Sequence, residues 1–234
     1  MINKLDFETY LYIFQDKYQI IIFDTIKFKN LYIKEQKIFN EFNNNNLNDL
    51  NQFLEKNIYK IEKLVGSFIE SIILIIDNNK SFNINIASKK KNYENSLNKK
   101  NLENNLVELK DLFKENYQNQ KIMHMIINSY ILNDKKYYSF DSSLNSDHLC
   151  VEVSFLSISR DLIFVLEKLL EKYQIKITKY MCGNYIKNFS NNDESELSLI
   201  TYKLKNGLND NEVVLVQKDA VNKGFFEKFF QLFS

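Results

Sequence analysis

Histidine and cysteine, which often serve as general bases, nucleophiles and zinc ligands, are scarce in this 234-residue chain. The two histidines are His124 and His148, and the two cysteines are Cys150 and Cys182. His148 lies close to Cys150, but no second Cys/His pair completes the four ligands of a tetrahedral zinc site. We therefore interpret Cys150 as a small residue buried in a strand, and we expect no metal site.

His124 lies within the apolar run from Ile122 to Ile126, which has the composition of a β-strand. Alternate residues of a strand share one face, so His124 is expected on the same face as Ile122 and Ile126. This pattern favours a histidine packed in the core over a general base.

Neither serine nucleophiles nor paired carboxylates form a catalytic arrangement. Ser154 and Ser157 lie in or at the end of an apolar strand and have no identifiable partner in the sequence. Asp193 and Glu194 are adjacent but fall in a polar stretch, where two solvated carboxylates are expected. The sequence therefore predicts no catalytic residues and no enzyme.

Nucleotide binding needs glycines, because backbone N–H groups must approach a phosphate closely and the loop must take positive φ angles. No two of the four glycines lie close enough for a P-loop or a dinucleotide-binding fingerprint: Gly66, Gly183, Gly207 and Gly224. Asp24 ends a predicted strand and could hold a metal-bridged phosphate. With no glycine beside it, a solvated turn carboxylate is the better interpretation, and we expect no cofactor.

The composition indicates a folded protein without a large excess of either charge. Hydrophobic residues make up 44% of the chain and aromatic residues 14%, and the formal net charge is +1. A nucleic-acid-binding face needs an excess of Lys and Arg, so the charge argues against that class. Asn-rich stretches fit a genome biased toward A and T, and we interpret them as loops. With no secretory signal in residues 1–7 and no apolar stretch of the ~20 residues of a spanning helix, a cytoplasmic location is expected.

Hydrophobic spacing predicts the elements that position these residues. The first half of the chain is predicted to form a hairpin of two strands (Thr9–Phe14 and Tyr18–Phe23) and a third strand (Ile26–Ile33). A helix stopped by Gly66 follows (Leu47–Leu64), and then a buried strand (Ile69–Ile76) and its half-buried partner strand (Ser81–Ala87). Lys89–Asn105 is polar and charged, and most of it is expected to form a loop.

The second half is predicted to form a short helix (Leu102–Tyr117), two paired strands (Lys121–Leu132 and Leu149–Ser157) and a helix capped by Ser159 (Arg160–Tyr173). A strand (Ile175–Met181), a helix stopped by Gly207 (Glu194–Lys205) and a short strand (Glu212–Val216) follow. Asp134–Asp147 is expected to be a mobile connection. Strands and helices mix without regular βαβ alternation, which predicts an α+β fold with a mixed sheet and flanking helices.

The C-terminal segment Gly224–Ser234 has the spacing of a short amphipathic helix. At 100° per residue its bulky apolar residues fall on one arc: Phe225, Phe226, Phe229, Phe230, Leu232 and Phe233. Two lysines, Lys223 and Lys228, supply positive charge. Such a helix can lie in a membrane interface, where each buried Phe contributes roughly 1.5–3 kcal/mol. The alternative is a helix docked on the protein's own core. The almost wholly aromatic face and the polar flank Asp219–Gly224 favour the membrane.

The order of elements resembles the FtsA family of bacterial cell-division proteins, which are actin-like and end in a membrane-targeting helix. The resemblance is clearest from Leu47 to Phe189, over the inserted domain called SHS2 or 1C. The family pattern His-x-Ile-Pro-x-x-Tyr is similar to residues 124–130, with matches at His124, Ile126 and Tyr130 and with Ile127 in place of proline. The helix segment Val165–Lys168 and the small residues Cys182–Gly183 are also similar to their counterparts in the family.

Two departures limit what the resemblance implies. The first hairpin turn is Gln15–Lys17, where the family has a glycine-bearing phosphate loop. After Phe189 there is no room for most of the second actin-like half, which in the family helps to bind ATP and contacts FtsZ. The resemblance therefore implies a membrane adaptor of the cell-division machinery, while these residues argue against ATP binding and leave FtsZ binding open.

The expected organisation has four parts. Residues 1–46 are a β-rich remnant of an actin-like subdomain, 47–190 an SHS2/1C-like domain, 191–217 a remnant helix and strand, and 218–234 a tether and amphipathic membrane helix. The predicted function is a non-enzymatic, FtsA-like adaptor, peripheral on the cytoplasmic side of the inner membrane. It is expected to bind divisome proteins through the 1C-like domain and lipid through the tail, but no nucleic acid; self-association is left open. The alternative is a soluble interaction module of a pilus-assembly (PilM-like) or secretion system.

Overall fold

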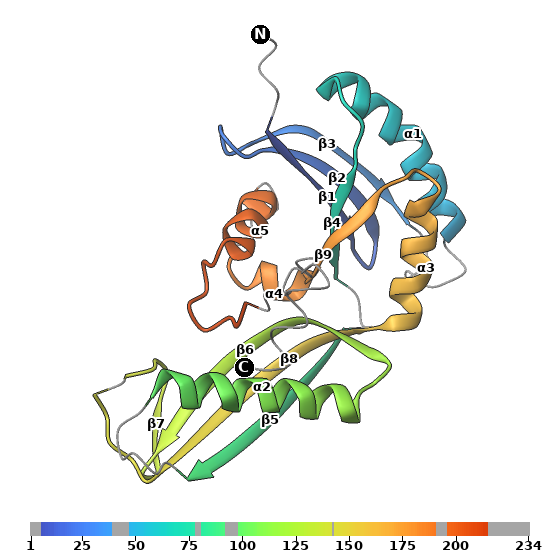
Figure 1. The fold of residues 1–234 in the computed structure, drawn as a ribbon. Helices are drawn as coiled ribbons and strands as arrows, with labels where there is room; N and C mark the ends of the chain where they lie inside the picture. The colour runs from blue at the N-terminus through green and yellow to red at the C-terminus, as the bar shows by residue number, and fades with distance from the viewer. Residues whose placement is uncertain are drawn as a thin grey trace, which may run out of the picture.

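The computed structural model describes residues 6–38, 47–77, 81–91, 98–141, 143–190 and 196–214. These residues form two β-sheets, one above the other in Figure 1, with helices packed on both. The arrangement is α+β with a mixed sheet and flanking helices, as the sequence predicts. No helix in the described part of the chain is long and apolar enough to cross a membrane. The expected tether and membrane helix, residues 218–234, lie outside the described residues.

The larger sheet, here called sheet A, combines antiparallel and parallel strands. In sheet order its strands are β3 (Lys29–Lys37), β2 (Lys17–Asp24), β1 (Phe7–Ile13), β4 (Ser71–Ile76) and β9 (Lys176–Cys182). The first three form an antiparallel meander, whereas β4 runs parallel to β1 and β9 parallel to β4. The central strands are runs of Ile, Tyr and Phe that are buried on both faces, which is typical of strands covered by helices on either side. The predicted hairpin is confirmed, and the third strand begins at Lys29 because residues 25–28 form the turn.

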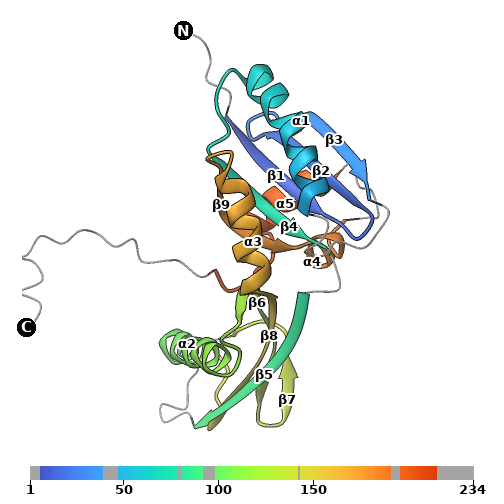
Figure 2. The same ribbon diagram turned by 90° about the vertical axis from the view of Figure 1, so that its right-hand side faces the viewer.

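Helices cover both faces of sheet A. On one face lie α1 (Leu47–Val65) and α3 (Arg160–Glu171), seen in front of the sheet in Figure 2. On the other lie the short α4 (Gly183–Lys187) and α5 (Leu197–Lys205). The predicted helix boundaries at Gly66 and Ser159 are confirmed. Gly66 has φ +73°, and the Ser159 hydroxyl accepts the backbone N–H of Asp161 at 3.2 Å.

The smaller sheet, sheet B, is antiparallel and has one helix on one face. Its strands, in sheet order, are β5 (Ser81–Lys91), β8 (His148–Ser159), β6 (Gln120–Leu132) and β7 (Lys135–Tyr137). The helix α2 (Lys99–Asn116) lies across it, and the Phe113 ring stacks on Phe155 at 4.7 Å between centroids. The predicted pairing of Lys121–Leu132 with Leu149–Ser157 is confirmed by β6 and β8.

Two expectations about sheet B are wrong. Ser81–Ala87 was expected to pair with Ile69–Ile76, but β5 pairs with β8 over its whole length, because alternation fixes the faces of a strand and not its partner. Lys89–Asn105 was expected to be mostly loop. Instead β5 continues to Lys91, and α2 begins at Lys99 after the N-cap Asn98, whose side chain accepts the N–H of Lys100 at 2.8 Å. The expected connection Asp134–Asp147 contains β7.

Sheet A takes strands from both sides of the expected boundary between residues 46 and 47, because β1 pairs with β4. Sheet B, with α2, is instead one continuous insertion between β4 and α3. The predicted strand at Glu212–Val216 is represented by a single bridge between Glu212 and Ile126, and residues 215 and 216 lie outside the described part.

Candidate functional site

The carboxyl ends of the parallel strands of sheet A lie beside sheet B, at the edge where parallel sheets usually bind ligands. Asp77 follows β4, and its N–H donates to the carbonyl of Ile13 at 2.9 Å. Gly183 follows β9, and a Cβ at this position would lie 3.0 Å from the Asp77 Cα and closer still to its Cβ. Only glycine therefore lets α4 start this close to the end of β4.

Protein side chains fill the space beyond these strand ends. The Lys187 ammonium forms an ion pair with Asp77 and lies 4.9 Å from the centroid of the Phe14 ring. That ring stacks on Tyr12 at 5.6 Å, and both Phe14 and Asp77 are buried. A phosphate placed here would meet the Asp77–Lys187 ion pair and an aromatic ring rather than the free backbone N–H groups of a glycine loop.

Asp24 lies at the opposite end of sheet A, since β2 runs antiparallel to β1. Its carboxylate accepts the backbone N–H groups of Lys27 at 2.8 Å and Ile26 at 3.0 Å, and these bonds hold the pKa of Asp24 below its usual range. The interpretation as a turn carboxylate is therefore confirmed, although the residue is 2% exposed rather than solvated.

His124 lies at the centre of a buried polar cluster that joins the two sheets. Its Nε2 accepts the backbone N–H of Cys182 at 2.9 Å, and its Nδ1 lies 2.7 Å from Glu212 Oε1. Because a backbone N–H can only donate, Nε2 carries no proton, and the ring is a neutral tautomer that donates from Nδ1 to Glu212. The other Glu212 oxygen accepts the Tyr185 hydroxyl at 2.9 Å, and that hydroxyl in turn accepts from Asn209 at 2.8 Å.

The backbone beside this cluster extends sheet B. In the segment Asn209–Val213, here called the clasp, the Asn211 carbonyl accepts from Ile127, and the Val213 N–H donates to Met125. The clasp therefore lies along the free edge of β6 like a short additional strand.

The structural role predicted for His124 agrees with this environment. His124 was also predicted to share a strand face with Ile122 and Ile126, and only the second of these is correct. Ile126 lies on the same side, in the core around sheet A, whereas Ile122 packs into the core under α2. The reason is a bulge in β6 between Ile122 and His124, which shifts the alternation by one residue.

A groove runs along the junction of the two sheets, next to this cluster. Its volume is about 370 Å³. The face of sheet B that α2 leaves open forms one wall, and α4 forms the other; the lining residues are Ser81, Phe82, Asn83, Ile126, Asn128, Ser154, Leu156, Cys182, Asn184, Tyr185 and Asn188.

A chain of hydrogen bonds crosses three strands of sheet B, and two of its three members, Asn128 and Ser154, line this groove. Asn128 donates to the Ser154 hydroxyl at 2.7 Å, and Ser154 donates to Asn85 Oδ1 at 2.6 Å. Ser154, for which the sequence shows no partner, therefore has two. Ser157 also has one, since its hydroxyl donates to Gln120 Oε1 at 3.4 Å.

The asparagines of the groove were missed in the sequence because asparagine was attributed to base composition. A signal was present, since asparagine is uncommon in strands and two occur at alternate positions of one strand, Asn83 and Asn85.

The remaining predicted site residues are not brought together. Cys150 is half-buried in β8 and burial raises the pKa of its thiol, while His148 is exposed. In the part of the chain that the structure describes, no three His, Cys, Asp or Glu side chains gather as metal ligands would. Asp193 and Glu194 lie outside the described residues, as do the predicted membrane-binding residues: Lys223, Phe225, Phe226, Lys228, Phe229, Phe230, Leu232 and Phe233.

No family model matches the chain, and no curated protein does. Solved structures give remote matches. One is the PilM–PilN type IV pilus biogenesis complex, with a TM-score of 0.48 and 8% identity over 76% of this chain and 48% of that one. Another is the cytoplasmic domain of EpsL, an inner-membrane component of the type II secretion system of Vibrio cholerae, with a TM-score of 0.35 and 7% identity over 77% and 57%.

A third match is a Bacteroides thetaiotaomicron protein of unknown function, described as having an actin-like ATPase fold, with a TM-score of 0.28 and 14% identity over 81% of this chain and 58% of that one. The chain thus covers 48% to 58% of the length of these three proteins. The likeness concerns fold alone.

Proposed function

We propose that this protein is a non-enzymatic adaptor of the actin-like class that binds an extended segment of a partner protein in the junction groove. The observation that carries the proposal is the hydrogen-bonded row Asn128, Ser154 and Asn85 on sheet B, of which Asn128 and Ser154 line the groove opposite α4. Amide side chains both donate and accept hydrogen bonds, so they can match the N–H and C=O groups of an extended peptide backbone.

The ionisable groups that line the groove favour binding over chemistry. Burial raises the pKa of the Cys182 thiol and that of the Tyr185 hydroxyl, so both groups are neutral near pH 7. A thiol held in its neutral form is a poor nucleophile. The groove therefore offers neutral hydrogen-bonding groups beside the apolar side chains of Ile126 and Leu156.

The adaptor is proposed to act in a membrane-associated assembly, with the amphipathic sequence Gly224–Ser234 as its lipid contact. A pilus or secretion system is the first candidate, an assembly of the kind in which PilM–PilN and EpsL are described. The cell-division machinery is the second, on the resemblance at His124, Ile126 and Tyr130. That resemblance is weakened because His124 is buried in the cluster beneath the groove and is not available to a partner.

Site-specific crosslinking in living cells tests the groove. A photoreactive amino acid replaces Asn83, which is exposed and lines the groove, or Tyr59, which is exposed on α1 away from it. We expect a discrete crosslinked partner from position 83 and not from position 59, and we expect Asn128→Lys to abolish it. No product, or the same product from both positions, would contradict the proposal. Identification of that partner by mass spectrometry separates pilus, secretion and division assemblies.

A further inference from the structure

β5 is the outer strand of sheet B among the residues that the structure describes. It pairs with β8 through eleven consecutive residue pairs without a register shift, whereas the β6–β8 ladder has two bulges. Natural edge strands are usually protected by bulges, proline or charge, because their outer N–H and C=O groups can pair with another chain. Here only one end is charged, at Lys89–Lys91, and Ser81–Ser88 contains neither charge nor proline.

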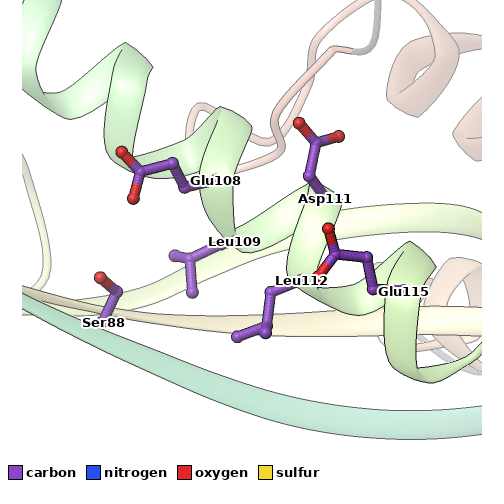
Figure 3. Close-up of a pocket in the computed structure, with 6 residues that line it drawn as sticks. All are labelled: Ser88, Glu108, Leu109, Asp111, Leu112 and Glu115. Atoms are coloured by element: carbon purple, nitrogen blue, oxygen red, sulfur yellow. The ribbon is translucent and has the colours of Figure 1, made fainter.

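A groove of about 320 Å³ lies between this edge and α2. Figure 3 shows Leu109 and Leu112 pointing from α2 toward the strands, with Ser88 of β5 opposite them. Leu112 is 45% exposed, and Ile84 and Ile86 of β5 are only half-buried against the core under α2. The apolar floor at this edge is therefore incomplete, as it would be if one more strand belonged there.

Carboxylates form the rim of this groove. Glu108 is paired with Lys90, and Asp111 lies 4.0 Å from Lys114, but Glu115 forms no ion pair with any described residue. Lys90 and Lys114 offset two of these three carboxylates, which leaves the charge of Glu115. The rim therefore favours a ligand with positive charge.

We propose that the edge of β5 and the neighbouring face of α2 bind an extended segment of another protein, added to sheet B as a fifth strand, whose face toward α2 carries both apolar and basic side chains. Its backbone pairs with β5, and its apolar side chains cover Leu112, Ile84 and Ile86. Its basic side chains lie beside Asp111 and Glu115. This site is separate from the junction groove, which lies on the other face of sheet B.

A second copy of this chain fits the site less well. The basic residues of β5 are all at one end, and pairing two copies about a twofold axis would bring the same α2 carboxylates toward each other.

Binding of a short synthetic peptide with valine and lysine on one face of the strand and serine on the other, measured by fluorescence anisotropy at low salt, tests the proposal. The double variant Asp111→Lys/Glu115→Lys should weaken binding at least tenfold. Glu103→Lys, which adds charge on the same helix outside the groove, should leave binding within twofold, and the same peptide with glutamate in place of lysine should not bind.

Hydrogen exchange on the full chain locates the peptide. We expect slower exchange at the β5 amides when the valine–lysine peptide is bound. Three results would overturn the proposal: no binding by the unmodified protein, slowed exchange only at other elements, or a dimer in sedimentation that Ile84→Lys dissociates. The last result would make a second copy the occupant. Circular dichroism of each variant excludes loss of folding as the cause.

Discussion

The imidazole of His124 and the carboxylate of Glu212 lie 2.7 Å apart although 88 residues separate them in the sequence, and both side chains are almost completely withdrawn from solvent. They are the point at which the inserted sheet B is joined to the segment that follows α5. Because His124 also accepts from the backbone at the end of β9, one ring connects three parts of the chain.

Replacing His124 by alanine is expected to destabilise the fold by about 3–4 kcal/mol. The substitution removes a packed ring and leaves both the Glu212 carboxylate and the Cys182 N–H without their partner. His148→Ala is the control, because that ring is exposed, and its expected effect is within about 0.5 kcal/mol. Urea denaturation followed by circular dichroism measures both, and equal effects would show that the buried cluster contributes nothing.

Stability should fall in acid because of Glu212. Burial raises the pKa of this carboxyl, but the hydrogen bond and electrostatic interaction with His124, the hydrogen bond from Tyr185 and the charge of Lys179 outweigh burial, and the pKa lies below its ordinary value of 4.5. In that range the unfolded chain takes up the proton before the folded one, so the stabilisation is complete above about pH 4.5 and is lost as the pH falls through the folded pKa.

Glu212→Gln tests this pH dependence. The variant should be less stable than the unmodified protein at pH 7 by about 1–2 kcal/mol, since a charged acceptor is replaced by a neutral one. The difference between the two proteins should shrink as the pH falls below 4.5. A difference that stays constant from pH 7 to pH 3 would contradict the assignment. Glu103→Gln, exposed on α2, is the matched control.

Gly183→Ala is expected to cost about 1–3 kcal/mol, because the added Cβ collides with Asp77 and must displace α4 from the end of β4. At Gly66 the surroundings are open, so alanine there costs only about 1 kcal/mol for its positive φ. Chemical denaturation of the two variants gives the comparison. A smaller loss at position 183 than at position 66 would mean that this junction is loosely packed.

Magnesium-ATP is expected to leave the melting temperature unchanged. The strand ends where a nucleotide phosphate would lie are occupied by Phe14 and by the ion pair of Asp77 and Lys187. Since a ligand that binds only the folded state raises the melting temperature, scanning fluorimetry with and without millimolar nucleotide is sufficient. A concentration-dependent rise would show nucleotide binding.

Deletion of Gly224–Ser234 is expected to release the protein from anionic liposomes in a flotation assay. Phe229→Ser should weaken binding about tenfold or more, because burial of one Phe contributes roughly 1.5–3 kcal/mol. Gln231→Ser, on the polar arc of the same segment, should have little effect. If the truncated protein floats as well as the full chain, the anchor lies elsewhere or does not exist.

Local features of the fold were predictable from the sequence, and long-range ones were not. The runs around Tyr12 and Ile21 and the caps at Gly66 and Ser159 depend on neighbouring residues only, so their spacing identified them. The partner of β5 depends on a strand about seventy residues away, and alternation carries no information on it. The charge of Lys89–Lys91 suggested a loop, but lysines also occur in edge strands, where they discourage unwanted pairing.

The candidate site was harder to predict than the fold. Its binding groups are asparagines, which carry no charge and belong to no motif, and its stabilising pair joins a strand of the insert to a residue near the end of the described chain. His124 was identified as structural from its apolar neighbours. Its role in joining the two sheets could not be inferred, because nothing in the sequence relates it to Glu212.

The pairing of Ser81 with Ile158 has a consequence for how the chain can change over time. The two ends of the insert are neighbours in one ladder, so the chain enters and leaves sheet B at adjacent positions. Because its two ends are adjacent, the insert of about eighty residues (sheet B and α2) connects β4 to α3 as a short turn would. The insert can therefore be exchanged, enlarged or reshaped while sheet A keeps its own framework, provided that the new module still presents an edge to the clasp.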